Sequence, residues 1–326
     1  GDIDKAMEII RKKGQAVAAK RSDREASEGC VLAKSTGQFA AIIALKCETD
    51  FVAKNADFVA LTQAILDAAV ANKCKTLDEV KALPLGNGTV QDAVTDRSGI
   101  TGEKMELDGY NVVEGAYTSI YNHQGNNQLC TIVAMNKEAE AAAHGVAMQI
   151  AAMNPQYISR NDISDEELAK LREITVDSAL NDATTLPKPI LNKLIDKAIN
   201  EKLWSDDDIN NFNEHKNNMN YVWNFLSDAA KAKLGELAMA DKESIVAEKM
   251  FNGLVEGRVS KQLKEICLLD QTYVKAEDGK QSVAKYLESV SKDLTITEMV
   301  RFEVGEGMEK KQEDFAAEVA AQMAGV

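Results

Sequence analysis

An apolar run, a charged corner and an amphipathic run, in that order, constrain the fold of this 326-residue chain most. Residues 39–45 are all apolar and predict a buried strand, which a turn around Gly37 joins to a strand at 30–34. Residues 47–55 form the corner, and apolar side chains at helical spacing after it predict a helix that ends near Ala71. The chain is therefore organised around a hairpin and the helix that follows it.

The same order recurs further along the chain. Glu114-Gly115 begins a predicted strand as Glu28-Gly29 does, Gly125 lies in the turn, and 138–153 predicts the helix. Internal duplication explains this recurrence, and chance similarity of two common hairpin–helix units is the alternative. The sequence predicts an α+β fold with a duplicated core of two small antiparallel sheets with packed helices, plus a helical insertion and a C-terminal helix.

Gly14 follows three basic residues and predicts the end of a first helix, after which 15–24 is predicted to be a helical linker. The predicted insertion is rich in Asn and holds both tryptophans, Trp204 and Trp223. Five domains are predicted: 1–20, a helical remnant and linker; 21–110, the first half of the core; 111–180 with 246–307, its second half; 181–245, the insertion; and 308–326, a C-terminal helical module.

Composition argues against several classes of function. The net charge of -14 and the pI of about 4.9 oppose direct binding to nucleic acid. No apolar run is long enough to predict a membrane span. The five cysteines lie far apart and three histidines lack metal-ligand spacing, so we expect reduced thiols, no metal and no cofactor.

No set of residues predicts an enzyme. The standard phosphate-binding glycine loops are absent from the sequence. Cys47 could be a nucleophile, but it ends an apolar strand and has no histidine nearby in sequence, which favours a buried, unreactive thiol.

Phe51 lies at the corner, between Asp50 and Lys54. Its ring can fold back onto its own helix, which is the commoner fate of an aromatic side chain. Alternatively it can project into solvent as an anchor for a partner protein. The residues alone leave both interpretations open.

Six blocks of residues, in order, resemble the bacterial elongation factor Ts family. They are DIDKA to RKKG at 2–14, TDFVAK at 49–54, EGR at 256–258, LLDQ at 268–271, RFEVGEG at 301–307 and DFAAEVA at 314–320. The match has a gap at about 181–242, and Thr272 stands where the family usually has Pro. The resemblance implies that 1–14 is the last helix of a UBA-like N-terminal domain whose earlier helices are absent.

This resemblance implies guanine-nucleotide exchange on the GTPase elongation factor Tu, during translation elongation in the cytoplasm. Phe51 would wedge near the magnesium site of the GTPase, Asp50 would make a polar contact, and Thr49 and Val52 would shape the corner. On the second half, Met148 and Gln149 would face another domain of the GTPase, although the family often has His where Gln149 stands.

The sequence leaves the roles of the predicted C-terminal helix and of the insertion open. Phe315 and Val319 lie on the apolar stripe of a predicted helix at 313–323, which fits packing on its own domain as well as partner binding. The rival function is a non-catalytic adaptor that binds an unrelated protein through the Asn- and Trp-containing insertion. The family's insertion makes self-association or partner contacts in some members, so a homodimer is a further expectation.

Overall fold

The computed structural model describes residues 1–306. These residues divide into two compact units. The first comprises Gly1–Ser159 and the described residues from Ile266 onwards, and it contains both three-stranded sheets. The second unit lies between Arg160 and Glu265 and is helical.

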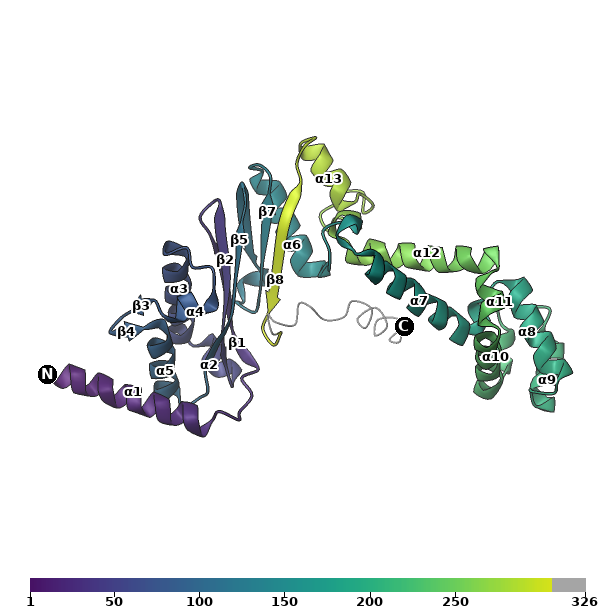
Figure 1. Ribbon diagram of the computed structural model, residues 1–326, viewed down its shortest axis with the longest axis horizontal. Coiled ribbons are helices and arrows are strands. Elements are labelled where there is room, and N and C mark those ends of the chain that lie inside the picture. The colour runs from purple at the N-terminus through teal and green to yellow at the C-terminus, as the bar shows by residue number, and fades with distance from the viewer. Residues whose placement is uncertain (307–326) are drawn as a thin grey trace. The chain divides into compact units, whose positions relative to one another are not determined.

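The first unit has four layers in the order helix, sheet, sheet, helix (Figure 1). Its strands are β1 (Glu28–Ser35), β2 (Phe39–Cys47), β5 (Glu106–Glu114), β6 (Tyr117–Asn122), β7 (Leu129–Met135) and β8 (Ile296–Glu303). The sheet orders are β1-β2-β5 and β6-β7-β8, with antiparallel neighbours throughout. Each sheet is a hairpin with a third strand, from later in the chain, beside its second strand. The predicted α+β fold is thus confirmed.

The two middle strands, β2 and β7, are buried on both faces. Along β2, Ile43 and Leu45 face the helices while Ile42 and Ala44 face the other sheet. Successive side chains of a strand point to opposite faces, so burial on both sides requires the unbroken apolar run at 39–45.

Helices cover the outer face of each sheet. Those near the first sheet are α2 (Asp50–Lys54), α3 (Ala56–Ala71), α4 (Leu77–Lys81) and α5 (Val90–Thr101). The small hairpin of β3 (Pro84–Leu85) and β4 (Gly88–Thr89) lies between α4 and α5 in sequence. Helices α6 (Glu140–Met153) and α13 (Val283–Val290) pack on the second sheet.

The sequence did not predict strand β5, and because of it the second hairpin begins later in the chain than predicted. Glu114 ends β5 instead of beginning a strand, and β6 begins at Tyr117. Strand β5 contains Asp108, Gly109 and Asn111, all poor strand formers. It lies at a sheet edge, and its register with β2 slips by one residue at Asp108, which is a bulge.

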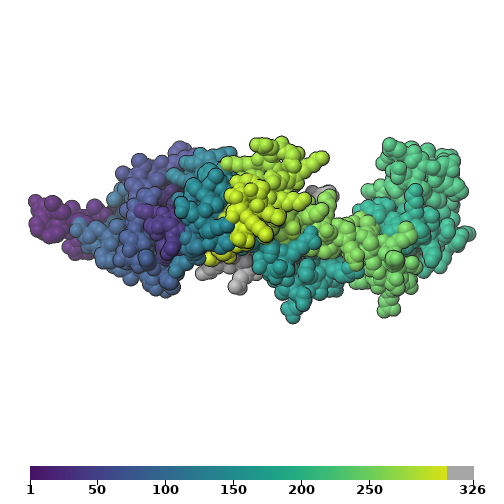
Figure 2. Space-filling view, turned by 90° about the horizontal axis from the view of Figure 1, so that it is seen from above, coloured from purple at the N-terminus to yellow at the C-terminus, as the bar shows by residue number. Residues whose placement is uncertain are grey.

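Helix α1 (Asp2–Lys20) runs straight through Gly14, so the predicted helix end there is wrong. Gly14 is buried where α1 crosses α5, and a Cβ atom on it would overlap the carbonyl oxygen of Thr95. Gly99 of α5 faces Gly14 across this crossing. In Figure 2 the purple residues of α1 lie beside blue residues of the first unit. Gly14 therefore serves close helix packing and not helix termination.

The second unit has a hydrophobic core of its own. Its helices are α7 (Asp165–Asn181), α8 (Lys188–Asn200), α9 (Asp206–His215), α10 (Asp228–Ala240), α11 (Lys242–Val246) and α12 (Lys249–Ile266), the last ending in the first unit. Trp204 is buried in this core and donates a hydrogen bond from Nε1 to the carbonyl oxygen of Ala230 at 3.0 Å. Since α7 and α12 share this core, the unit is longer than the predicted insertion at 181–245. The predicted domain bounds stay predictions.

The chain leaves and re-enters the first unit at one place. The amides of Gln156 and Tyr157 both donate to the carbonyl oxygen of Ile266, at 2.8 and 3.1 Å. The amide of Leu268 donates back to the carbonyl oxygen of Tyr157 at 2.8 Å. The second unit is therefore inserted between two segments that hydrogen-bond to each other.

The predictions for the C-terminal module and for membrane-spanning segments bear differently on the residues that the structure describes. The C-terminal module at 308–326 lies outside the described residues, as do Phe315 and Val319. Within residues 1–306, no helix is both long enough and apolar enough to cross a membrane.

Candidate functional site

The corner after β2 folds as the five-residue helix α2. Thr49 begins it: its Oγ1 accepts a hydrogen bond from the amide of Val52 at 3.4 Å. Ala53 is buried and Val52 packs partly buried against the first-sheet core. Asn55 then ends α2 and caps α3, with Oδ1 accepting from the amide of Asp57 at 2.9 Å.

Phe51 is 84% exposed, so the interpretation that its ring folds back into the core is wrong. Asp50 and Lys54 of the same helix are charged and exposed as well, and they form an ion pair at 3.8 Å across one helical turn. A large apolar ring thus projects into solvent from a capped helix. That arrangement is typical of an anchor in a protein–protein interface.

Glu103 holds the residues that precede α2, and sequence reasoning missed it. Its Oε1 accepts hydrogen bonds from the amides of Glu48 at 3.1 Å and Thr49 at 3.0 Å. Its Oε2 accepts from the Thr49 hydroxyl at 2.7 Å. Glu103 lies 54 residues from Thr49 in sequence, in the turn between α5 and β5, so no local pattern could link the two.

Glu48 ties the corner to two other segments. Its Oε1 accepts from the amide of Lys104 at 2.8 Å, and its Oε2 pairs with Arg21 at 2.6 Å. Burial would raise the pKa of the Glu48 carboxyl, but these hydrogen bonds outweigh it and lower that pKa. The Lys104 ammonium donates to the carbonyl oxygens of Ser22 and Arg24, at 3.0 and 3.1 Å.

Cys47 is buried at the end of β2, and its Sγ donates to the carbonyl oxygen of Thr49 at 3.2 Å. Burial raises the pKa of this thiol to about 12, and the nearby carboxylates of Glu103 and Glu28 add to the effect. At neutral pH the thiol is protonated and a poor nucleophile. All five cysteines are buried and none forms a disulfide bond, and residues 1–306 contain no cluster of three or more metal-ligating side chains.

The predicted contact residues of the second half lie on α6, away from the corner. Gln149 is fully buried: its Nε2 donates to Gln271 Oε1 and to the carbonyl oxygen of Thr272, and its Oε1 accepts from the amide of Val274. This side chain fixes a neighbouring loop and presents no area to a partner in this structure. Met148 is half-buried. A partner contact at this position stays a prediction.

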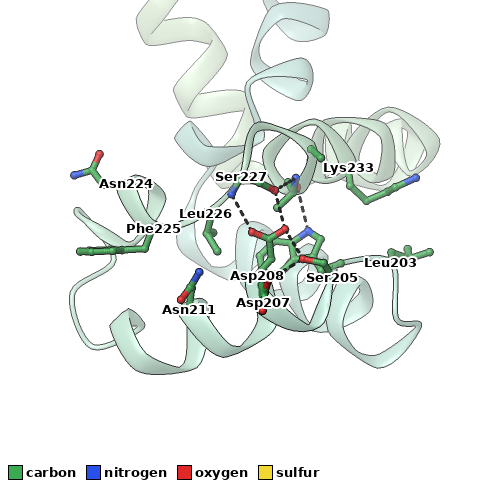
Figure 3. A pocket seen from close by; sticks show the side chains of 13 residues that line it. Leu203, Ser205, Asp207, Asp208, Asn211, Asn224, Phe225, Leu226, Ser227 and Lys233 are labelled. Atoms are coloured by element: carbon green, nitrogen blue, oxygen red, sulfur yellow. Dashed lines mark hydrogen bonds between the residues drawn. The ribbon is translucent and has the colours of Figure 1, made fainter.

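The second unit has a hollow of about 600 Å³ between α9 and α10. Its central carboxylate, Asp208, accepts hydrogen bonds from the amide and hydroxyl of Ser227 at 2.9 and 2.7 Å and from the hydroxyl of Ser205 at 2.9 Å. Figure 3 shows Phe225 and Lys233 on opposite sides of this hydrogen-bonded group. Both oxygens of Asp208 thus join two helix N-termini, and the hollow is a structural junction.

Comparison with known proteins agrees with the corner motif. A family described as Elongation factor TS matches residues 48–306, which include the TDFVAK block, much of the first unit and the whole of residues 160–265. The Elongation factor Ts of Phocaeicola vulgatus is 61% identical over 303 residues, covering 93% of this chain and 89% of the relative.

The chain belongs to the elongation factor Ts family. More distant members agree: the Elongation factor Ts of Parabacteroides distasonis is 56% identical over 303 residues, covering 93% of this chain and 89% of the relative. That of Porphyromonas gingivalis is 40% identical over 306 residues, covering 92% and 87%. The family assignment made from six short blocks is thereby confirmed, and the assignment extends across the region at 181–242 where the blocks gave no match.

Proposed function

We propose that this chain is a guanine-nucleotide exchange factor for elongation factor Tu in translation elongation, and that Phe51 is its wedge. One observation carries the proposal: Phe51 is 84% exposed on a capped corner helix, in a member of the elongation factor Ts family. An exposed phenylalanine contributes nothing to a core, whereas a partner's pocket can bury the whole ring.

The physical basis is linkage between two binding events. A partner that binds the nucleotide-free GTPase more tightly than the loaded one weakens nucleotide binding by the same factor. Magnesium bridges the nucleotide phosphates in strict octahedral geometry, so a small displacement by Phe51 would cost affinity. Asp50 supplies a polar contact, while Thr49 and Val52 fix the shape of the corner. No covalent bond changes, so the chain acts by binding and not as an enzyme.

Release of fluorescent GDP from elongation factor Tu tests the proposal. Phe51→Ala should slow stimulated release by roughly thirtyfold, since truncation of a central anchor typically costs about 2 kcal/mol. The matched control is Phe225→Ala, which removes another exposed aromatic ring, in the second unit. Release that is unaffected by Phe51→Ala but lost with Phe225→Ala would move the exchange surface from the corner to the second unit. Absence of stimulated release with the unaltered chain would favour the adaptor hypothesis instead.

Further contacts belong to the same proposal. The face around Met148, and Phe315 and Val319 of the C-terminal module, would add binding surface to the GTPase. Translation elongation would place the chain in the cytoplasm.

A further inference from the structure

We propose that Glu103 is a positioning residue that fixes the corner so that Phe51 is presented in one orientation; this inference rests on the proposed function. The need for such a residue follows from the exposure of Phe51, because an exposed ring has few contacts of its own to hold it. Its position is set by the backbone of α2. A helix of five residues is unstable by itself, so tertiary contacts must hold that backbone.

Glu103 supplies hydrogen bonds to the two residues directly before α2. Three hydrogen bonds converge on its carboxylate, from the amides of Glu48 and Thr49 and from the Thr49 hydroxyl. Hydrogen bonds to an ionised carboxylate are stronger than those between neutral groups. They fix two consecutive residues directly before α2, at the point where the chain turns out of β2.

The Thr49 hydroxyl links Glu103 to the helix itself. It donates its proton to Glu103 Oε2 at 2.7 Å, which leaves an oxygen lone pair for the amide of Val52 at 3.4 Å. Without Glu103 the hydroxyl can rotate and the cap loses its orientation. Phe51 lies between the two ends of this chain of hydrogen bonds without contributing to it.

Glu103 is itself held in place. Gly102 ends α5 with φ of 74°, a left-handed conformation that suits glycine. The Ser98 hydroxyl donates to the carbonyl oxygen of Glu103 at 2.5 Å. The next residue, Lys104, donates its amide to Glu48 at 2.8 Å, so the turn and the corner each accept hydrogen bonds from the other. This mutual arrangement makes Glu103 a rigid support.

Amide hydrogen exchange tests the support without any partner. In Glu103→Ala the amides of Glu48, Thr49 and Val52 should exchange at least tenfold faster than in the unaltered chain. The amide of Asp57, capped by Asn55, should not change. Glu106→Ala, which removes an exposed carboxylate three residues further on, is the matched control and should leave all four amides unchanged. Unchanged exchange at Glu48 and Thr49 in Glu103→Ala would overturn the inference.

A double-mutant cycle on GDP release tests whether the support acts through Phe51. Glu103→Ala should lower the maximal release rate roughly tenfold, because residues in one network are energetically coupled. In a Phe51→Ala background it should have no further effect. Glu103→Gln keeps an oxygen acceptor for the two amides and should restore part of the rate. A full tenfold loss in the Phe51→Ala background would overturn the inference.

The two arms separate this inference from the proposed function. If the unaltered chain fails to stimulate GDP release from elongation factor Tu, the proposed exchange function is wrong. The hydrogen-exchange result still decides whether Glu103 fixes the corner. If the unaltered chain stimulates GDP release and Glu103→Ala stimulates it at the same rate, only the proposed role of Glu103 is wrong. Should Glu103→Ala fail to fold, Glu103→Gln takes its place in both arms, with faster amide exchange and a reduced rate expected.

Discussion

At the scale of single residues, the sequence predicted where Phe51 lies in the fold but not which residues hold the corner around it. The TDFVAK block identified Phe51 at a strand-to-helix corner, because strand and helix periodicities meet there. Glu103 was missed since its hydrogen bonds reach 54 and 55 residues back along the chain. The burial of Gln149 also could not be read from the sequence, because its hydrogen-bond partners lie more than 120 residues away along the chain. Contacts between segments that are distant in the sequence produce no periodic pattern from which they could be predicted.

Asp208 gives a prediction at this scale. Burial would raise the pKa of its carboxyl, but the hydrogen bonds from Ser227 and Ser205 lower it overall. Asp208→Asn should therefore destabilise the second unit by about 1–3 kcal/mol at neutral pH. In the unaltered chain, ionised Asp208 makes its full contribution to the stability of the second unit above the ordinary aspartate pKa of about 4. This contribution is lost as the pH falls through the lower pKa that Asp208 has in the folded state.

Tryptophan fluorescence during denaturation measures this effect, because both tryptophans lie in the second unit. The difference between the variant and the unaltered chain should shrink as pH is lowered from about 5 towards about 2. Asp206→Asn removes an exposed charge from the same helix and is the control. A difference that is constant over this pH range would contradict the role of the ionised carboxylate.

The buried cysteines give a second prediction. Burial raises the pKa of Cys30 to about 11 and that of Cys130 to about 12, as it does for Cys47. The native chain should therefore react very slowly with a thiol reagent at about pH 8, and all five thiols should react after denaturation. Rapid labelling of Cys47 in the native state would show that the corner opens.

At the scale of elements, the errors come from residues whose type fits two structural roles. Gly14 fits a helix end and a close helix crossing equally well, and only α5 decides between them. Strand β5 contains three poor strand formers among its nine residues, and its pairing with β2 makes it a strand. In contrast, β2 and α3 were located correctly, because a long apolar run and a long amphipathic run each fit one structure.

The crossing of α1 and α5 can be tested by substitution. In a helix interior, alanine is more favourable than glycine by about 1 kcal/mol. Gly14→Ala should nevertheless lower the melting temperature, because the added Cβ would overlap the carbonyl oxygen of Thr95. Gly253→Ala, in α12, is the matched control: nothing lies within 4 Å of its added Cβ, and it should stabilise. Circular dichroism during heating measures both. Stabilisation by Gly14→Ala would mean that α1 is not tightly docked.

At the scale of the whole molecule, the sequence predicted the two sheets and an insertion, but not how much of the chain the second unit includes. Helices α7 and α12 are amphipathic, and an amphipathic pattern does not say which core the apolar face will join. In the structure, Val176 and Val255 pack with the inserted helices. A separate core of this kind is what allows a unit to fold by itself.

Excision of the second unit tests that independence. A chain in which a short glycine–serine linker replaces 160–265 should keep the first unit folded, because the linker joins segments that already hydrogen-bond to each other. Circular dichroism and cooperative thermal unfolding measure the result. Aggregation or loss of cooperative unfolding would show that the sheets depend on the removed helices.

The pairing of Tyr157 with Ile266 and Leu268 also makes this position an attachment point for engineering. A foreign domain whose own first and last residues lie close together could replace residues 160–265 as a cassette. The strand register of both sheets would stay as it is, because the four hydrogen-bonded residues at the junction are retained. A fluorescent protein or an affinity module placed there would then report on the chain without altering the Phe51 corner.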